Sequence, residues 1–356
     1  MEDLSFQGHM DNLKDPRQHY KIAYPLDEIM IQTLCAVIAG CETFVDIAKY
    51  GEAKLDFLRS LRPFRNGTPS HDVLSDFFRS LDARAFEAVF REWVAGLGEE
   101  LRGVVAIDGK SSRGSKPKGG HALHLISAFA CEAGFVLGQK ASTGKKNEIV
   151  DIPELLDMLV LKGAIVTIDA MGCQKEIAAK IREKEADYLL ALKGNQGHLH
   201  DDVETFFDDP HTPESLSFHE TTDGDKGRIE QRRHYVCTDI DWLRARHPDW
   251  QDLAMIGMIE SQRSAGGKTS TTRRYYIGSR MMNAESFAAA ARAHWGIENR
   301  LHWVLDVTFR DDDCRVCKDD GPENFSVIKH MAINLLKKAK QKDSLRVMRK
   351  HAGWDD

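Results

Sequence analysis

Two aspartates follow largely apolar runs that are long enough to form buried strands. Asp108 comes directly after residues 104–107, and Asp169 comes directly after residues 164–168. Both carboxylates are therefore expected where a strand gives way to a loop, and the carboxyl ends of parallel strands meet at one edge of a sheet. Carboxylate oxygens are the ligands that Mg²⁺ and Mn²⁺ prefer in proteins. The two positions predict a divalent-cation site.

Glu298 adds a third carboxylate, from a helix. Counted at 100° per residue, it shares a face with six residues that form a largely apolar stripe: Phe287, Ala291, His294, Leu301, His302 and Leu305. Burying an ionised carboxyl costs several kcal/mol unless a charge or a hydrogen-bond donor offsets it. That partner could be His294 or His302, one turn away on either side, at a half-exposed edge. The two upstream aspartates favour the other partner, a bound cation.

The elements that would position these carboxylates alternate in a recognisable order. We expect three meandering strands, at 103–109, 124–130 and 135–142. A helix at 147–161, a strand at 164–169, a second helix at 173–184 and a fifth strand at 188–193 follow. Right-handed crossovers give this order a mixed sheet with helices on both faces. The predicted class is α/β with a ribonuclease-H-like core, formed by residues 101–197 and 284–340.

A helical N-terminal domain is predicted for residues 11–100. Apolar residues recur at helical spacing over 22–39 and 45–61. Ser70 and Asp82 are placed to cap two further helices, at 72–81 and 85–97. This second pair could be a helix-turn-helix that reads DNA, or the two helices could simply pack together. Residues 1–10 look like a protease-site and cloning remnant, so Met10 is the expected native start.

A β-rich insertion is predicted between the last core strand and the Glu298 helix, at residues 198–283. After a short acidic helix, alternating segments occur at 228–238, 253–260 and 271–279. The insertion carries six basic residues that could form a nucleic-acid surface or could be ordinary solvated strand faces: Lys226, Arg228, Arg232, Arg233, Arg273 and Arg274. A glycine-rich basic loop at 110–120 could likewise hold phosphates or be a solvated hairpin. Residues 341–356 form a basic tail.

Composition limits the classes of function. The formal net charge of −6 excludes a uniformly basic coat for nucleic acid, although local basic patches remain possible. Seven cysteines, an odd number, indicate reduced thiols in a cytosolic protein, and the single Cys314–Cys317 pair lacks the second pair of a zinc knuckle. No apolar run reaches the roughly 20 residues that a membrane-spanning helix needs.

Eight blocks follow one another in the order and spacing of a known family. They lie at 106–110, 126–129, 147–149, 152–156, 167–175, 193–196, 227–230 and 294–303, and include Ala-Ile-Asp-Gly-Lys, Lys-Gly-Asn-Gln and His-Trp-Gly-Ile-Glu-Asn-Arg-Leu-His-Trp. The chain resembles, from about Asp11 to its end, the ISAs-type insertion-sequence transposases. These are Asp-Asp-Glu (DDE) enzymes, and the group includes the H-repeat-associated proteins.

The resemblance implies a transposase that cuts the ends of its own mobile element and joins the freed 3′-hydroxyl to target DNA. Carried over by position, the catalytic and metal-binding triad is Asp108, Asp169 and Glu298. Two Mg²⁺ or Mn²⁺ ions would be expected, with Asp108 bridging them, Asp169 on one ion and Glu298 on the other. No tyrosine or serine is placed to form a covalent intermediate. The expected partners are double-stranded DNA, as terminal inverted repeats and target, and a second copy of the chain, in the bacterial cytoplasm at the nucleoid.

Polar residues in these blocks, in the loop at 110–120 and in the insertion are the expected DNA contacts. They are Lys110, Arg113, Lys193, Asn195, Gln196, Arg228, Arg232, His294, Asn299, Arg300 and His302. One departure from the family bears on them. Related enzymes often carry a tyrosine, an arginine and a lysine seven before, four before and seven after the glutamate, whereas this chain has Ala291, His294 and Leu305. The end-binding roles of those residues do not transfer directly.

Three other functions are compatible with parts of the pattern. A ribonuclease-H-like nuclease would cut DNA without joining it. A metal-free DNA-binding relic of a transposase would have no reason to keep Asp108, Asp169 and Glu298. A zinc hydrolase could use His294, Glu298 and His302 as ligands, but both aspartates would then be unexplained.

Overall fold

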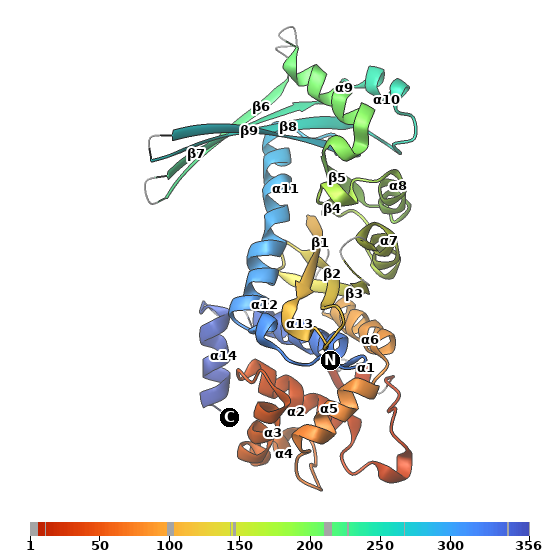
Figure 1. Cartoon of the computed structure of the whole chain (residues 1–356), viewed down its shortest axis with the longest axis vertical. Helices are drawn as coiled ribbons and strands as arrows, with labels where there is room; N and C mark the ends of the chain where they lie inside the picture. The colour runs from red at the N-terminus through yellow and green to blue at the C-terminus, as the bar shows by residue number, and fades with distance from the viewer. Residues whose placement is uncertain are drawn as a thin grey trace.

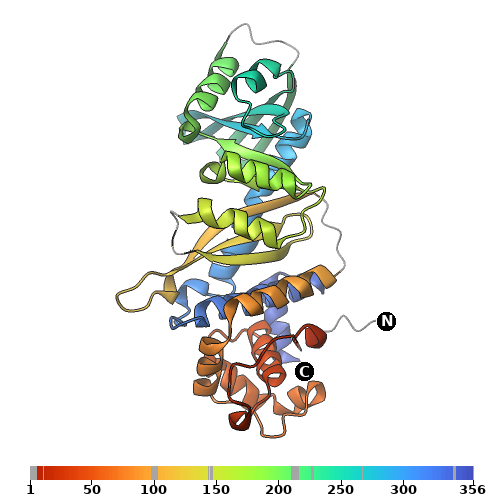
Figure 2. The same cartoon turned by 90° about the vertical axis from the view of Figure 1, so that its right-hand side faces the viewer.

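The computed structural model describes residues 6–10, 12–97, 103–142, 144, 147–209, 216–225, 228–266, 268–339 and 342–355. Within them, one nine-stranded sheet has the order β3-β2-β1-β4-β5-β9-β8-β7-β6. The N-terminal helices lie at one end of an elongated molecule and the last four strands at the other (Figures 1 and 2). None of the helices in the described ranges is long and apolar enough to cross a membrane.

The first five strands form the predicted ribonuclease-H-like core. β1 (Val104–Ser112), β2 (Leu123–Ala130) and β3 (Phe135–Ser142) are an antiparallel meander, and β4 (Ile165–Ile168) and β5 (Asp187–Leu192) run parallel to β1. Helices α7 (Glu148–Met158) and α8 (Lys175–Glu183) form the crossovers that parallel strands require. The predicted order of elements is confirmed.

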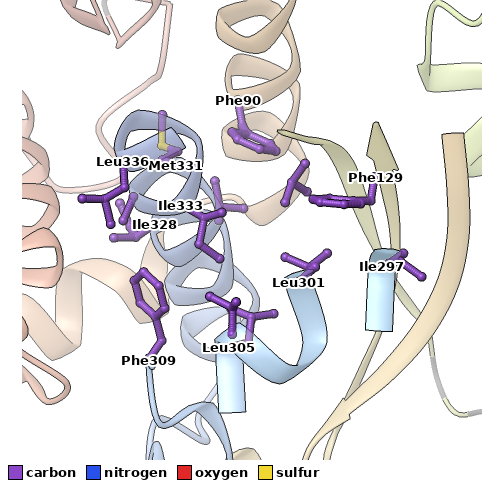
Figure 3. Packing of buried hydrophobic residues seen from close by; sticks show 14 of the residues in the cluster. Phe90, Phe129, Ile297, Leu301, Leu305, Phe309, Ile328, Met331, Ile333 and Leu336 are labelled. Carbon is purple, nitrogen blue, oxygen red and sulfur yellow. The ribbon is translucent and has the colours of Figure 1, made fainter. Parts of the chain in front are cut away.

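Strand alternation distributes β1 between two cores. Val105 and Ile107 pack with α7 and α8, whereas Val104 and Ala106 pack with helices on the opposite face. Asp108 is on the same side of β1 as Val104 and Ala106, so its side chain belongs to the face covered by α11 (Ala284–Ile297) and α13 (Gly321–Lys338). Figure 3 shows Leu301 and Leu305 packed toward Ile328 and Ile333 of α13. The core on this face of the sheet therefore fixes the segment that contains Glu298 against β1.

The inserted strands extend the core sheet. After α9 (Gly197–Asp208) come β6 (Ser217–Asp225), β7 (Arg228–Cys237), α10 (Asp241–Arg246), β8 (Met255–Ala265) and β9 (Lys268–Gly278). β9 pairs antiparallel with β5, from Leu189 opposite Gly278 to Leu192 opposite Tyr275. The far ends of these strands project beyond α11 as an arm (Figure 1). β6 was not predicted, because its polar sequence Ser-Phe-His-Glu-Thr-Thr-Asp-Gly-Asp lacks apolar alternation.

The N-terminal region is helical, as predicted. It contains α2 (Leu26–Ile38), α3 (Phe44–Ala53), α4 (Leu55–Leu61), α5 (His71–Ser80) and α6 (Ala83–Gly96). Ser70 and Asp82 accept backbone N–H groups as N-caps. Asn324 of α13 donates from its buried amide to the carbonyls of Phe78 and Leu81, which joins the α5–α6 turn to the core. This contact packs the helix pair against α13.

Both ends of the described chain are packed more closely than their sequences indicated. Residues Phe6–Met10 form the short helix α1, and Met10 is buried in the core, whereas the sequence of residues 1–10 indicates a cloning remnant. Leu345–Trp354 form helix α14, whereas a basic tail was expected. Arg349 of α14 is buried and donates to the carbonyls of Val37 and Thr308. Leu345 and Met348 are the buried apolar residues of α14, and the seven basic residues around them conceal this face in the composition.

Candidate active site

The register of the sheet brings Asp108 and Asp169 to the same end of two adjacent strands. β1 and β4 are parallel, and Ile107 pairs with Ile168, so the two aspartates follow paired residues. Asp108 Oδ1 accepts the N–H of Gly109 at 2.9 Å. Asp169 Oδ1 accepts the N–H groups of Met171 at 3.0 Å and Gly172 at 3.3 Å, which caps the turn Ala170–Gly172. Each carboxylate keeps a second oxygen, Oδ2, that does not take part in these bonds.

Glu298 reaches this strand end from a wider turn in its helix. Residues Glu298–His302 form a π-helical turn between α11 and α12 (Trp303–Val307). Ligand atoms of Asp108, Glu298 and His302 all lie within 4.8 Å of one another. His302 Nδ1 is 3.1 Å from Glu298 Oε2 and 3.6 Å from Asp108 Oδ2. A π turn inside an α-helix is a frequent feature of functional sites, because it redirects side chains.

The prediction that the Glu298 side chain is buried is wrong. Its side chain is 57% exposed, although Leu301, His302 and Leu305 in the same stripe are buried. The stripe faces the core, but Glu298 lies where that core opens at the end of β1. The hydrogen bond from His302 matches one of the two predicted partners, whereas His294 bonds to Thr167 Oγ1 at 3.0 Å. His294 therefore does not join Glu298 and His302 as a zinc ligand set.

The site concentrates negative charge around Asp108. Burial, together with the charges of Asp169, Glu148 and Glu298, raises the pKa of Asp108 to about 7, against the opposing hydrogen bond from the Gly109 N–H. A carboxylate surrounded by other carboxylates is stabilised in its ionised form by a bound cation. The donor set of carboxylates with one imidazole fits a divalent metal. Asp169 is adjacent, but it is outside the group whose ligand atoms lie within 4.8 Å.

Lys110, an expected DNA contact, is ion-paired within the chain. β1 continues to Ser112, because β2 pairs with it as far as Leu123, so the predicted loop starts later than residue 110. Lys110 Nζ lies 2.8 Å from Asp306 Oδ1 and 3.1 Å from Asp311 Oδ2, and its side chain is 11% exposed. The carboxylates of Asp306, Asp311 and Asp312 thus form a second acidic group that already contains an ammonium.

Three other expected DNA contacts are bonded within the chain. Asn195 donates to the carbonyl of Ala170 at 2.8 Å, and Gln196 donates to that of Cys173 at 2.6 Å. These amides join the loop after β5 to the Asp169 turn. Arg300 donates to the Cys131 carbonyl and lies over the Phe129 ring. In the structure, these three side chains bond to the backbone around the site.

The remaining expected contacts divide into exposed and paired side chains. Lys193 is exposed near the end of β5 and Asn299 is exposed in the Glu298 turn, and the exposed Arg113, just after β1, has its Nε 3.6 Å from Asp312 Oδ2. Arg232 is paired with Asp223 at 2.6 Å and Glu230 at 2.9 Å. The side chain of Arg228, like all of Lys226, lies outside the described residues. The basic surface predicted for the insertion is therefore partly neutralised by its own acidic residues.

Sequence reasoning missed a hydrogen-bonded row on the opposite face of β1. Ser111 Oγ lies 2.8 Å from His124 Nδ1, and His124 Nε2 lies 2.6 Å from Glu148 Oε1. His124 and Glu148 are both buried. The block at 147–149 contains Glu148, but nothing in its sequence indicated a partner on another strand. Strand pairing brings Ser111 and His124 opposite each other, and only the sheet register reveals this.

Comparison with known proteins agrees with this arrangement. The family described as "Transposase DDE domain" matches residues 99–335, and the family described as "DDE_Tnp_1-associated" matches residues 7–94. YncI of Escherichia coli O157:H7 is 41% identical over 95% of this chain and 89% of its own length. The H repeat-associated protein YhhI of Escherichia coli (strain K12) is 40% identical over 94% of this chain and 91% of its own length. Both relatives have the word transposase in their names.

Among solved structures, a piggyBac transposase synaptic complex with hairpin DNA superposes with a TM-score of 0.46 and 11% identity, covering 99% of this chain and 78% of that one. The two matched families together span nearly all of the sequence, and the catalytic one contains Asp108, Asp169 and Glu298. The chain belongs to the Transposase DDE domain family.

Proposed function

We propose that this transposase uses Asp108, Asp169 and Glu298 to hold two divalent metal ions, cuts the ends of a mobile element, and joins the 3′-hydroxyl to target DNA. The observation that carries the proposal is the convergence of Asp108 and Glu298, from a strand and a distant helix, at an open strand end beside Asp169. The raised pKa of Asp108 agrees with a site completed by cations.

Each side chain has a role that follows from its surroundings. Bound Mg²⁺ or Mn²⁺ would activate a water or a 3′-hydroxyl and stabilise the leaving oxygen. Asp108, between the other two carboxylates, is the proposed shared ligand. Asp169 offers Oδ2 while Oδ1 remains bonded to the turn that fixes it. Glu298 is exposed and can approach both DNA and a metal, and His302 restrains it through Nδ1.

Double-stranded DNA is the proposed partner, both as element ends and as target. Arg113, Lys193 and Asn299 are exposed around the site and are the proposed phosphate contacts. The arm formed by β6–β9 carries further exposed basic residues, Arg263 and Lys268, and Arg274 over the Trp295 ring. We propose that residues 198–283 act as a DNA-facing arm, residues 11–100 as a helical support, and two copies of the chain as a synaptic dimer at the bacterial nucleoid.

The test is a metal-dependent assay on duplexes that carry the ends of the flanking element. Wild-type protein and Glu298→Gln are compared with Mg²⁺, with Mn²⁺ and with EDTA. The proposal predicts nicked and joined products that require metal and disappear in the variant. Nicked products without joined ones would instead indicate a nuclease that has lost strand transfer. Binding to DNA with no cutting under any metal would indicate a DNA-binding relic and would refute the proposal.

A further inference from the structure

Glu148 lies directly behind Asp108, on the other face of β1. It is the first residue of helix α7, and the residue is 5% exposed. A Cβ atom on Gly109, the residue after Asp108, would collide with Glu148 Oε1 and would lie 2.7 Å from His124 Nε2. Only a glycine leaves room for this carboxylate against the strand. The close approach places Glu148 one peptide unit from the proposed metal ligand.

The hydrogen bonds around Glu148 hold its carboxylate in a fixed position. His124, which is buried, donates from Nε2 to Glu148 Oε1 over 2.6 Å. The Ser111 hydroxyl can then donate to His124 Nδ1 over 2.8 Å, so that one imidazole bonds to both neighbours. In this arrangement the Glu148 carboxylate accepts its hydrogen bond from His124. The row Ser111–His124–Glu148 therefore presents a fixed charge to the back of β1.

A buried charge at this place acts on Asp108 through a medium of low polarity. Coulomb interactions between buried groups are several times stronger than between exposed ones. A negative charge fixed directly behind Asp108 favours a cation bound to the carboxylates in front of it. Lys110, the nearest ammonium along β1, is occupied by Asp306 and Asp311 on the other face.

Resting on the metal site of the proposed function, we propose that Glu148 is a fourth carboxylate of that site, which strengthens divalent-cation binding through its charge without coordinating the ion. It is a positioning residue and not a catalytic one, because β1 separates it from the reacting atoms. His124 holds it in place, and the glycine at position 109 allows the approach.

The test measures Mn²⁺ binding to the full chain without DNA, by calorimetry or by Mn²⁺ electron paramagnetic resonance. Glu148→Gln keeps the shape of the side chain and removes its charge, and should weaken Mn²⁺ binding about tenfold. Glu148→Asp keeps the charge and should remain within about threefold of wild type. A purely structural Glu148 predicts the opposite order, because aspartate is too short for His124. Glu154→Gln, an exposed site on the same helix, controls for removal of one charge.

Two further variants complete the test. His124→Gln can still donate to Glu148, and should bind Mn²⁺ within about threefold of wild type; a tenfold gain would mean that a charged His124 cancels Glu148 and would overturn the inference. If Glu148→Gln does not fold, the double variant with His124→Gln replaces it, since the two amides can bond to each other.

Mn²⁺ binding that is lost in Asp108→Asn but unchanged in Glu148→Gln overturns only the role of Glu148. A wild-type chain that binds no Mn²⁺ and cuts no DNA overturns both.

Discussion

Replacing Asp311 by alanine is expected to destabilise the chain by about 3–5 kcal/mol. Asp311 is 5% exposed and accepts three donors: Lys329 Nζ at 2.6 Å, Ser112 Oγ at 2.6 Å and Lys110 Nζ at 3.1 Å. Lys329 is also buried. Removing the carboxylate leaves the buried ammonium of Lys329 without its carboxylate partner, while Lys110 keeps Asp306, and this is the costly way to break a buried ion pair.

The pH dependence of this effect has a definite sign. Burial alone would raise the pKa of Asp311, but the charges of Lys329 and Lys110 outweigh it and hold the pKa well below its ordinary value. A lowered folded-state pKa gives stability that is complete above the unfolded-state value near 4 and is lost as the pH falls through the folded-state value. The difference between wild type and Asp311→Ala should therefore be largest at pH 6–8 and shrink in strong acid.

Urea denaturation at pH 7 and pH 3 measures both expectations. Asp312→Ala is the matched control, because it belongs to the same turn and lies 3.7 Å from Lys110 but is 33% exposed. The control should cost under about 1 kcal/mol. A second variant, Asp311→Leu with Lys329→Met, should recover part of the loss, since it removes the stranded charge. An Asp311→Ala protein as stable as Asp312→Ala at pH 7 would refute the role given to this network.

Three other changes have expected outcomes. Leu301→Ala, in the fully buried stripe below the site, should cost about 2–5 kcal/mol in urea denaturation; a cost below 1 kcal/mol would mean that the core there collapses around the cavity. Asp108→Asn should raise the melting temperature of the metal-free chain at pH 8, because a folded-state pKa raised to about 7 lowers stability as the pH rises from near 4 to 7; an unchanged or lower melting temperature at pH 8 contradicts it. Gly109→Ala should destabilise by about 1–3 kcal/mol and abolish DNA cutting, because its Cβ meets Glu148 and His124; cutting at the wild-type rate would show that the strand end can shift freely.

Much of the catalytic core is predictable because its elements have strong local signals. The apolar runs before Asp108 and Asp169 and the caps at Ser70 and Asp82 are short-range patterns, and the structure has the corresponding strands and helices. The single helix expected at 45–61 is two helices that meet at Lys54. Interruptions of this kind depend on tertiary packing, which no local pattern records.

The interior of the site was less predictable, because long-range pairing decides it. Lys110 has the composition of a phosphate-binding residue, and only the position of Asp311, two hundred residues later in the chain, gives it another role. The exposure of Glu298 depends on a π turn, and a count at 100° per residue assumes a regular α-helix. The row from Ser111 to Glu148 depends on the β1–β2 register.

The two acidic groups beside β1 differ in how their charge is balanced, and the difference has a consequence for function. Asp108, Lys110 and Ser112 alternate onto one face of the strand, so successive side chains are about 7 Å apart. A lysine at that spacing could neutralise Asp108 and displace a metal. Asp311 opposes this together with Asp306, because both carboxylates hold Lys110 and Asp311 also binds Lys329. Loss of Asp311 should therefore weaken Mn²⁺ binding as well as stability, and adding Lys110→Met to Asp311→Ala should restore the binding but not the stability.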